Sequence, residues 1–305
     1  MSGILVTGAN GHLGRRLIAN LPDGTPLEAL VRSARARRRL ERDVAGKPGL
    51  NVSLVAPHDA TAVAALAMRC ERAVHLIGTI RETPGNRYED SHQRPARALL
   101  EAAARSGLRR IVYLSILGAD AASESACLRA RAAVENMLLE AAVPACIIRV
   151  PMVLGEGDRA SKALARRARA KRVLLFRGES LEQPIYAGDV VVALRHALEV
   201  EPAINGVLEL AGPESLTRAA LVARAAAACG TRPRIHSLPL GLGLAFVGAM
   251  ELLRARAPVT RDMLRVLDHD DAIDPQAAAA TLGVSLTPLD TMLARCVGDR
   301  PVQDA

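Results

Sequence analysis

Three glycines near the start of the chain have the spacing of a phosphate-binding turn. Gly8, Gly11 and Gly14 follow an apolar run of strand type, Gly3 to Thr7. In such a turn the first glycine permits a tight bend, the second lets backbone amides approach a diphosphate, and the third lets a helix pack on the strand. The helix N-terminus adds free N–H groups and partial positive charge. The residues expected to contact a dinucleotide here are Gly8, Asn10, Gly11, His12, Leu13 and Gly14.

The end of the second predicted strand distinguishes between the two nicotinamide dinucleotides. That strand, Leu27 to Val31, is followed directly by Arg32, and Arg35 is close behind. An acidic residue at this position would accept the ribose 2′-hydroxyl of NAD, whereas a cation favours the 2′-phosphate of NADP. Glu28 stands too early in the strand to serve. The sequence therefore favours NADP(H) over NAD(H), with Arg32 as the phosphate contact.

Short apolar runs alternate with helical stretches through the first half of the chain. The predicted strands are Gly3–Thr7, Leu27–Val31, Val52–Val55, Ala73–Ile77, Ile111–Ser115 and Cys146–Val150. Ala-rich helical stretches lie between them, notably Pro95–Arg105 and Leu128–Ala142. Strands that alternate with helices predict an α/β fold with a doubly wound parallel sheet. Continuous apolar character within the strands indicates that both faces of the sheet are covered.

After Pro151 this alternation weakens. Val173–Tyr186 predicts a hairpin or an irregular excursion, and Thr217, Asp274 and Thr287 are expected to cap helices. We therefore expect a second, smaller and mostly helical lobe. The predicted division is a Rossmann domain over residues 1–155, continued by about 187–212, and a C-terminal lobe over 156–186 and 213–305.

The composition is that of a folded globular protein. Of the 305 residues, 50% are hydrophobic and 24% are charged, which excludes general disorder. The five cysteines form no C-x-x-C pair, so we expect neither a disulfide framework nor a metal site. The first residues lack the pattern of a secretory signal. These features predict a cytoplasmic protein.

The formal net charge is +8, and the cations cluster in two places. One cluster is Arg32 to Arg42. The other is Arg159 to Arg172, where seven cations occur with no acid. Basic runs favour anionic partners such as nucleic acids or membranes. The alternative is a solvated arginine-rich helix face, which the absence of interleaved aromatic residues favours.

The glycine turn, with its T-G-x-x-G-x-x-G pattern, resembles the short-chain dehydrogenase/reductase superfamily in its extended or atypical branch. Later stretches are similar, more narrowly, to the group related to the 39 kDa accessory subunit of respiratory complex I. These stretches are Val74–Gly78, Arg109–Ala119, Arg149–Arg159, Gln183–Val190 and Val259–Arg265. The resemblance implies that Gly78 lines the cofactor at the fourth strand. It also implies that Pro151 and Val153 lie beside the nicotinamide.

Active members of that superfamily use a tyrosine, a lysine four residues later and a serine on the preceding strand. By this resemblance Ser115 falls in the serine region, but Cys127 replaces the tyrosine and Arg131 replaces the lysine. Arg131 would still pair with ribose or phosphate. Cys127 is either a thiol acid or a buried, inert residue. The usual acid–base set is therefore expected to be missing.

The resemblance implies an accessory, assembly or regulatory protein that holds NADP(H) as a stabilising ligand. Its expected partner is a membrane-associated protein complex, which would place it in the cytoplasm or peripherally at the inner face of a membrane. The rival interpretation is an enzyme with a small-molecule substrate: an NADP(H)-dependent reductase, or a nucleotide-sugar epimerase or dehydratase, with an altered proton donor. A third is a redox sensor that binds lipid or nucleic acid through its arginine clusters, with nucleic acid the less favoured ligand.

Overall fold

The computed structural model describes residues 3–80, 82, 86–241 and 269–298. The chain divides into two compact units. Unit 1 comprises residues 1–149, 190–209 and 280–284, and unit 2 comprises residues 150–189, 210–279 and 285–305. Each unit has its own hydrophobic core.

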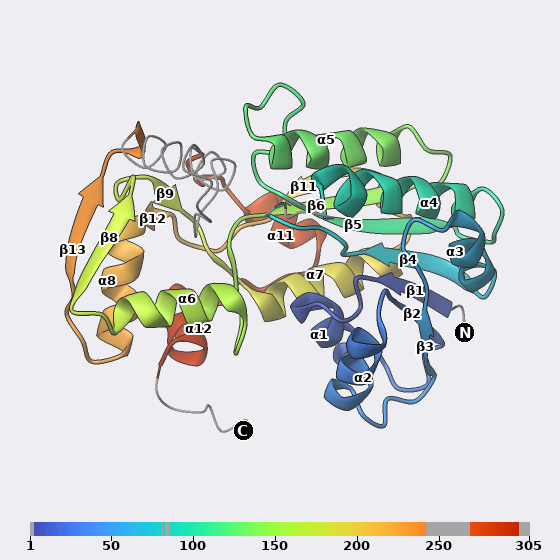
Figure 1. Ribbon diagram of the computed structural model, residues 1–305, viewed down its shortest axis with the longest axis horizontal. Coiled ribbons are helices and arrows are strands. Elements are labelled where there is room, and N and C mark those ends of the chain that lie inside the picture. Colours follow the sequence, from blue (N-terminus) through green and yellow to red (C-terminus); the bar gives the residue numbers. More distant parts are fainter. Residues whose placement is uncertain (1–2, 81, 83–85, 242–268, 299–305) are drawn as a thin grey trace. The chain divides into compact units, whose positions relative to one another are not determined.

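Unit 1 is built on a seven-stranded parallel sheet with the order β11-β6-β5-β4-β1-β2-β3 (Figure 1). Its strands are β1 (Gly3–Thr7), β2 (Leu27–Val31), β3 (Leu50–Leu54), β4 (Cys70–His75), β5 (Arg110–Ile116), β6 (Ala145–Val150) and β11 (Gly206–Glu209). The chain runs outward from β1 through β2 to β3 and then crosses to β4. The strand order therefore reverses between β1 and β4, which is where doubly wound sheets bind their ligands.

Helices cover both faces of this sheet, with α4 and α5 on one face and α1 and α7 on the other (Figure 1). The helices are α1 (His12–Asn20), α2 (Ala34–Asp43), α3 (Ala60–Ala67), the π-helical turn η1 (Glu89–Gln93), α4 (Arg94–Ala103), α5 (Ala126–Leu139) and α7 (Ala187–Glu199). Side-chain caps begin several of them: Ser33 accepts a hydrogen bond from the amide of Ala36 at 3.2 Å, and Asp59 accepts one from Ala62 at 3.0 Å. Such caps satisfy amides that have no partner within the helix.

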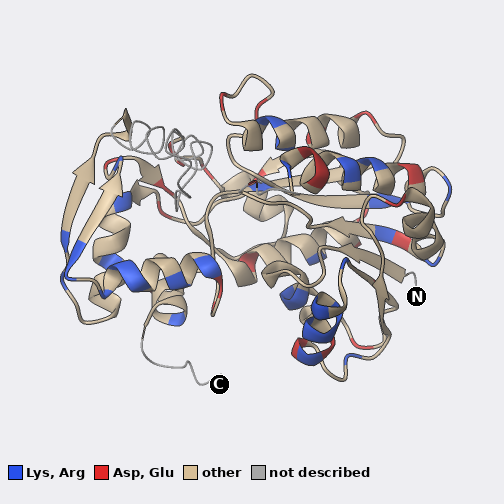
Figure 2. Cartoon of the chain, in the orientation of Figure 1, with Lys and Arg blue, Asp and Glu red and all other residues tan. Residues whose placement is uncertain are grey.

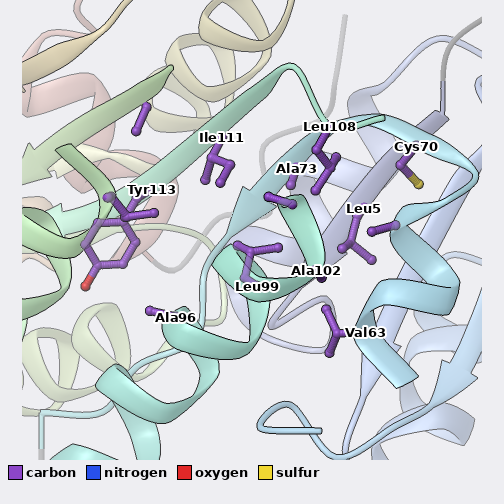
Figure 3. Packing of buried hydrophobic residues seen from close by; sticks show 14 of the residues in the cluster. Leu5, Val63, Cys70, Ala73, Ala96, Leu99, Ala102, Leu108, Ile111 and Tyr113 are labelled. Atoms are coloured by element: carbon purple, nitrogen blue, oxygen red, sulfur yellow. The ribbon is translucent and has the colours of Figure 1, made fainter. Parts of the chain in front are cut away.

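The core under α3, α4 and α5 is almost entirely aliphatic (Figure 3). Leu5 and Ile111 from the sheet pack with Val63 of α3 and Leu99 of α4, all at most 1% exposed. Tyr113 of β5 is the aromatic member of this cluster and is fully buried. Its phenol hydroxyl is a polar group within this apolar cluster, and a buried hydroxyl requires a hydrogen-bond partner.

Unit 2 joins short strands to a helical core. The strands pair as β7 (Val153–Leu154) with β10 (Ile185–Tyr186), β9 (Leu181–Glu182) with β12 (Leu216–Thr217), and β8 (Arg172–Phe176) with β13 (Arg234–Leu238). The helices are α6 (Arg159–Ala168), α8 (Arg218–Ala228), α11 (Gln276–Thr281), which crosses the unit boundary, and α12 (Leu289–Cys296). Leu164, Leu221 and Met292 bring α6, α8 and α12 into one buried cluster.

The structure decides one sequence prediction in unit 2 and corrects another. Of the two alternatives for Val173–Tyr186, the hairpin is wrong, because β8 pairs in parallel with the distant β13 and not with its own neighbour. Thr287 does not cap α12: its hydroxyl donates to Asp189 at 2.7 Å, and the helix starts after Pro288 without a side-chain cap. In contrast, Thr217 caps α8 as predicted, since its hydroxyl accepts from the amide of Ala220 at 3.1 Å.

The unit boundaries also differ in detail from the predicted domains. Residues 280–284, expected in the lobe, belong to unit 1. Leu282 is fully buried, and a side chain on Gly283 would meet the ring of His196 in α7 at 3.1 Å. The stretch Val259–Arg265, which contributed to the family resemblance, lies outside the described residues. None of the helices in the described part of the chain combines the length and apolarity that crossing a bilayer requires.

Candidate dinucleotide-binding site

The turn between β1 and α1 is shaped by its glycines. Gly8 adopts φ +73°, and a Cβ there would lie 2.8 Å from the carbonyl carbon of Leu76 on the neighbouring chain segment. The amide of Gly11 donates to the carbonyl of Gly8 at 2.9 Å and closes the turn. A Cβ on Gly14 would lie 2.6 Å from that same carbonyl oxygen. Side chains at the first and third glycines would therefore displace backbone, as the sequence pattern predicts.

Helix α1 begins without a side-chain cap. Gly11 occupies the N-cap position and has no side chain to accept a hydrogen bond from the first amides of the helix. The other helices of unit 1 that follow a strand, α2, α3 and α5, are capped by Ser33, Asp59 and Ser125. The start of α1, at the carboxyl edge of the sheet, therefore differs from the starts of these helices in having no side-chain cap. An anionic group is the chemical partner that such amides and the helix dipole favour.

A cavity of about 260 Å³ opens beside this turn, at the point where the strand order reverses. Its walls come from the ends of β1, β2 and β4 and from the segment that leads into η1. The lining residues are Gly8, Asn10, Gly11, Leu30, Arg32, Pro57, Leu76, Ile77, Gly78, Thr79, Asn86, Asp90 and Ser91. Five of them, Gly8, Asn10, Gly11, Arg32 and Gly78, are among the predicted cofactor contacts.

The other predicted contacts lie elsewhere. His12, Leu13 and Gly14 belong to the first turn of α1 and are not among the described residues that line the cavity. Pro151 and Val153 belong to unit 2, where Val153 pairs with Ile185. The predictions for these five residues therefore remain predictions.

Arg32 supplies the positive charge at the end of β2. Its side chain is exposed, lines the cavity and approaches the side-chain oxygen of Asn86 at 3.4 Å. Glu28, the acid of the same strand, is buried and already bonded, since its two oxygens accept from Asn51 at 2.7 Å and Arg69 at 2.9 Å. The end of β2 therefore offers a guanidinium and no carboxylate to a ligand in the cavity.

Asp90 is the one carboxylate among the described lining residues. Its side chain accepts a hydrogen bond from Arg94 at 2.9 Å. That bond and the positive charge of Arg94 hold the pKa of Asp90 below its usual value. Asp90 is consequently ionised at neutral pH, where it accepts hydrogen bonds and has no proton to donate.

Arg131 lies behind Gly78 and not on the cavity wall. A Cβ on Gly78 would meet the Nη2 atom of Arg131 at 2.4 Å and the ring of His92 at 2.8 Å. The guanidinium is buried and donates to the hydroxyl of Tyr113 at 3.1 Å and to the carbonyl of Leu114 at 2.8 Å. The guanidinium thus serves two internal acceptors among the described residues, and its predicted contact with the ribose or phosphate remains a prediction.

This buried cation has no ion-pair partner in the part of the chain that the structure describes. Its Nε atom is buried without a hydrogen bond, and so are Nε2 of His75 and Nδ1 of His92. Burial of an unpaired charge is unfavourable. Separately, a side chain at position 78 would occupy the space that the Arg131 side chain fills, so glycine is required there sterically.

His75 and His92 are held neutral by this environment. Nδ1 of His75 lies 2.8 Å from the hydroxyl of Thr7, and Nε2 of His92 lies 2.9 Å from the carbonyl oxygen of Thr79. Burial, followed by the positive charge of Arg131, lowers the pKa of each histidine to about 3. Both therefore serve as neutral hydrogen-bonding groups at physiological pH and not as acids.

These shifts predict a specific pH dependence of stability. The folded-state pKa is below the unfolded value, so the unfolded chain binds more protons between about pH 6.5 and pH 3, and stability falls as the pH falls through this window. Each histidine should contribute a slope of about 1.4 kcal/mol per pH unit. Urea unfolding at pH 7, 6 and 5 should show this loss, and His75→Gln should reduce the slope. An equal reduction by His58→Gln, at an exposed position, would argue against this origin.

Ser115 is engaged by a buried ion-pair network. Its hydroxyl donates to Glu135 of α5 at 2.5 Å. Glu135, only 2% exposed, also accepts from Arg149 of β6 at 2.6 and 3.1 Å, and Arg149 reaches Glu209 of β11 at 3.1 Å. Hydrogen bonding to Glu135 raises the pKa of Arg149. Ser115 thus bonds to a charged partner within unit 1 and is not among the described residues that line the cavity.

Cys127 is fully buried at the start of α5. Its sulfur lies 3.6 Å from the carbonyl oxygen of Thr79, within the range of a weak S–H hydrogen bond. The three residues at the superfamily's catalytic positions, Ser115, Cys127 and Arg131, are therefore all buried and bonded inside unit 1.

Sequence reasoning did not find the Glu135–Arg149 pair. A signal was present, because Arg149 is a cation inside the otherwise apolar strand Ala145–Val150. It also missed the wall formed by Asn86, Asp90 and Ser91, because no local pattern marks a loop that folds back over a strand end.

A model of a family described as NAD(P)H-binding matches residues 8–172, more than half of the chain. A mitochondrial protein of Arabidopsis thaliana named NADH dehydrogenase [ubiquinone] 1 alpha subcomplex subunit 9 is 29% identical over 266 residues, which cover 85% of this chain and 66% of that protein. The ceramide reductase of Caulobacter vibrioides is 29% identical over 242 residues, covering 77% of this chain and 73% of that protein.

Solved structures share the fold at lower identity. The NADPH-dependent quinone oxidoreductase QOR2 of Escherichia coli, complexed with NADPH, superposes with a TM-score of 0.73 at 18% identity and covers 96% of this chain and 99% of its own. This likeness confirms the predicted Rossmann-type α/β fold. The glycine turn, the cavity at the strand-order reversal and the family match agree, and the chain belongs to the NAD(P)H-binding family, with complex I subunits among its relatives.

Proposed function

We propose that this protein binds NADP(H) as a structural or regulatory ligand and serves as an accessory or assembly protein of a larger complex, without turning the dinucleotide over. The observation that carries the proposal is the buried, bonded state of Ser115, Cys127 and Arg131. The similarity to complex I subunits supports the accessory role.

The preference for NADP(H) rests on the charges at the end of β2. Arg32 lines the cavity, whereas both oxygens of Glu28 are used by Asn51 and Arg69. A guanidinium binds a phosphate through charge-assisted hydrogen bonds, whereas its hydrogen bond with an uncharged ribose hydroxyl is weaker. The uncapped amides of α1 would hold the diphosphate, and the glycines of the turn leave room for its close approach.

The proposed lack of turnover is supported by the absence of an acidic proton donor among the described residues that line the cavity. A bound nicotinamide dinucleotide provides or accepts a hydride, and reduction of a carbonyl also requires a proton at its oxygen. Among the described lining residues, Asp90 is ionised and Arg32 is a permanent cation, so neither donates a proton at neutral pH. The hydroxyl of Ser115 is directed to Glu135.

A ligand that is not consumed can still act through stability. Binding to the folded form alone adds about 2.7 kcal/mol when the free ligand is at a hundred times its Kd. Unit 1 would then be more stable when the dinucleotide is bound, and partner association could follow nucleotide supply. In this proposal the bound dinucleotide stabilises the accessory protein and is not consumed.

The test compares binding with turnover. We expect NADPH to raise the thermal midpoint of the purified protein, and we expect no loss of absorbance at the reduced nicotinamide band with a panel of aldehydes and ketones. Substrate-dependent oxidation that Cys127→Ala abolishes would overturn the non-catalytic part of the proposal. Loss of the thermal shift in Gly14→Val, where the added side chain meets backbone, would tie the stabilisation to the turn.

A second candidate function is an NADP(H)-dependent reductase with a different proton donor. The relative named ceramide reductase, at 29% identity over 77% of the chain, is the observation that favours it. A ceramide oxidised to the ketone therefore belongs in the carbonyl panel. NADPH oxidation with that compound alone would favour the reductase over the accessory protein.

A further inference from the structure

Unit 2 carries a concentrated cationic surface that the dinucleotide site does not use. We define the basic face as six exposed residues at the C-terminal end of α6 and the starts of β8 and β13: Arg166, Arg167, Lys171, Arg172, Arg232 and Arg234. Figure 2 shows this concentration of Lys and Arg along α6 and the adjoining strand ends.

Hydrogen bonds join these three segments into one surface. The hydroxyl of Thr231 donates to the carbonyl of Ala168 at 2.7 Å, which ties the start of the β13 segment to the end of α6. The amide of Arg234 donates to the carbonyl of Lys171 at 3.0 Å. The three segments that carry the six cations therefore adjoin in unit 2, although they come from two separate stretches of sequence.

The two basic stretches of the sequence differ in how they are neutralised. On α2, Arg37 pairs with Glu41 at 2.8 Å, and Arg39 and Arg42 approach Asp43 at 3.6 and 3.3 Å. No residue of the basic face forms an ion pair with a carboxylate among the described residues. The stretch from Arg159 to Gly178 contains no acid at all.

Strand register adds to this imbalance. Arg172 of β8 lies directly opposite Arg234 of β13. Like charges at opposed positions of paired strands are unfavourable. The C-terminal turn of α6 offsets part of the charge of Arg166 and Arg167 through the helix dipole, but the paired arginines have no such compensation.

The same sheet face continues from the cations into apolar side chains. Side chains alternate along β8, so Val173 and Leu175 are buried while Arg172 and Leu174 point outward. Leu174, opposite His236, is 67% exposed. A large apolar side chain in solvent beside a cluster of arginines is the pattern of a surface that lies in a lipid headgroup region, with the apolar group inserted and the cations at the phosphates.

We propose that the basic face docks unit 2 onto an anionic lipid bilayer. The charge complementarity and the exposed Leu174 carry this inference, which goes beyond the proposed function and needs no bound dinucleotide. The phosphates of a nucleic acid would pair with the cations, but a nucleic acid would leave the apolar side chain of Leu174 without an apolar partner. An anionic leaflet matches both, since each cation near such a surface strengthens binding and the leucine enters the boundary between headgroups and acyl chains.

The test is flotation of the 305-residue protein with vesicles of phosphatidylcholine, with and without about one third phosphatidylglycerol. We expect binding to the anionic vesicles only, with Arg172→Gln/Arg234→Gln weakening it roughly 25-fold, about fivefold for each cation. Because this double variant removes two like charges at opposed positions of paired strands, its thermal midpoint should not fall. Leu174→Ser, which keeps every cation, should weaken binding to the anionic vesicles several-fold at the same salt concentration.

The matched control is Arg35→Gln/Arg38→Gln, which removes two exposed cations of α2. Its vesicle binding should stay within about twofold of the wild type, since that helix is in the other unit. Equal weakening by both double variants would show that total charge and not the basic face is responsible. Binding to neutral vesicles, or binding to a polynucleotide or an acidic polypeptide but not to anionic vesicles, would overturn the proposal.

Discussion

Replacing Glu135 with alanine should lower the free energy of unfolding by about 3 to 5 kcal/mol. The carboxylate is 3% exposed and is the shared acceptor for Arg149 and Ser115. Its removal would leave the guanidinium of Arg149 half-buried without its main partner and would orphan a buried hydroxyl. Urea denaturation followed by circular dichroism measures this loss directly.

Glu209→Gln is the matched control for that experiment. Glu209 contacts the other side of the same guanidinium at 3.1 Å, but its side chain is 43% exposed. Exposed ion pairs contribute about 0 to 1 kcal/mol, so this variant should be nearly as stable as the wild type. A loss below about 1 kcal/mol in Glu135→Ala would contradict the role assigned to the buried network.

Reversing the charge at Arg32 should weaken NADPH binding roughly 100-fold while leaving NADH binding almost unchanged. The reason is that Arg32 is the cation at the end of β2 that lines the cavity, and only NADPH carries the 2′-phosphate. Fluorescence or calorimetric titration of Arg32→Glu with both nucleotides gives the two affinities.

Arg38→Glu makes the same charge change on an exposed residue of α2 that does not line the cavity. Its NADPH affinity should stay within about threefold of the wild type, because an exposed charge that makes no direct contact with the ligand acts on it through solvent and is weakened by salt. If both arginine variants weaken NADPH equally, the effect is one of general charge and the assignment of Arg32 is wrong. If Arg32→Glu weakens NADH as strongly as NADPH, Arg32 does not contact the 2′-phosphate.

The parts that the sequence predicted best are those fixed by local chemistry. The glycine turn, the strand Leu27–Val31 and the cap at Thr217 each depend on a few adjacent residues, and the structure has them as predicted. Apolar runs predicted the aliphatic core, because a buried parallel strand must be apolar on both faces.

The parts that the sequence could not predict depend on contacts between distant residues. The partner of β8 is about sixty positions away in the chain, and nothing in Arg172–Phe176 specifies β13 over a closer strand. The inward direction of Arg131 follows from acceptors on β5, Tyr113 and the carbonyl of Leu114. The local sequence pattern predicts that an arginine in a helix is exposed. The sequence therefore did not predict the burial of Arg131 behind Gly78.

The most direct test of the whole account is a calorimetric titration of nucleotide-free protein with NADPH and, separately, with NADH. We expect saturable one-to-one binding of NADPH, at least about tenfold tighter than that of NADH. If neither nucleotide gives a binding isotherm at millimolar concentration, the cavity beside Gly8 is not a dinucleotide site and the proposed function fails with it.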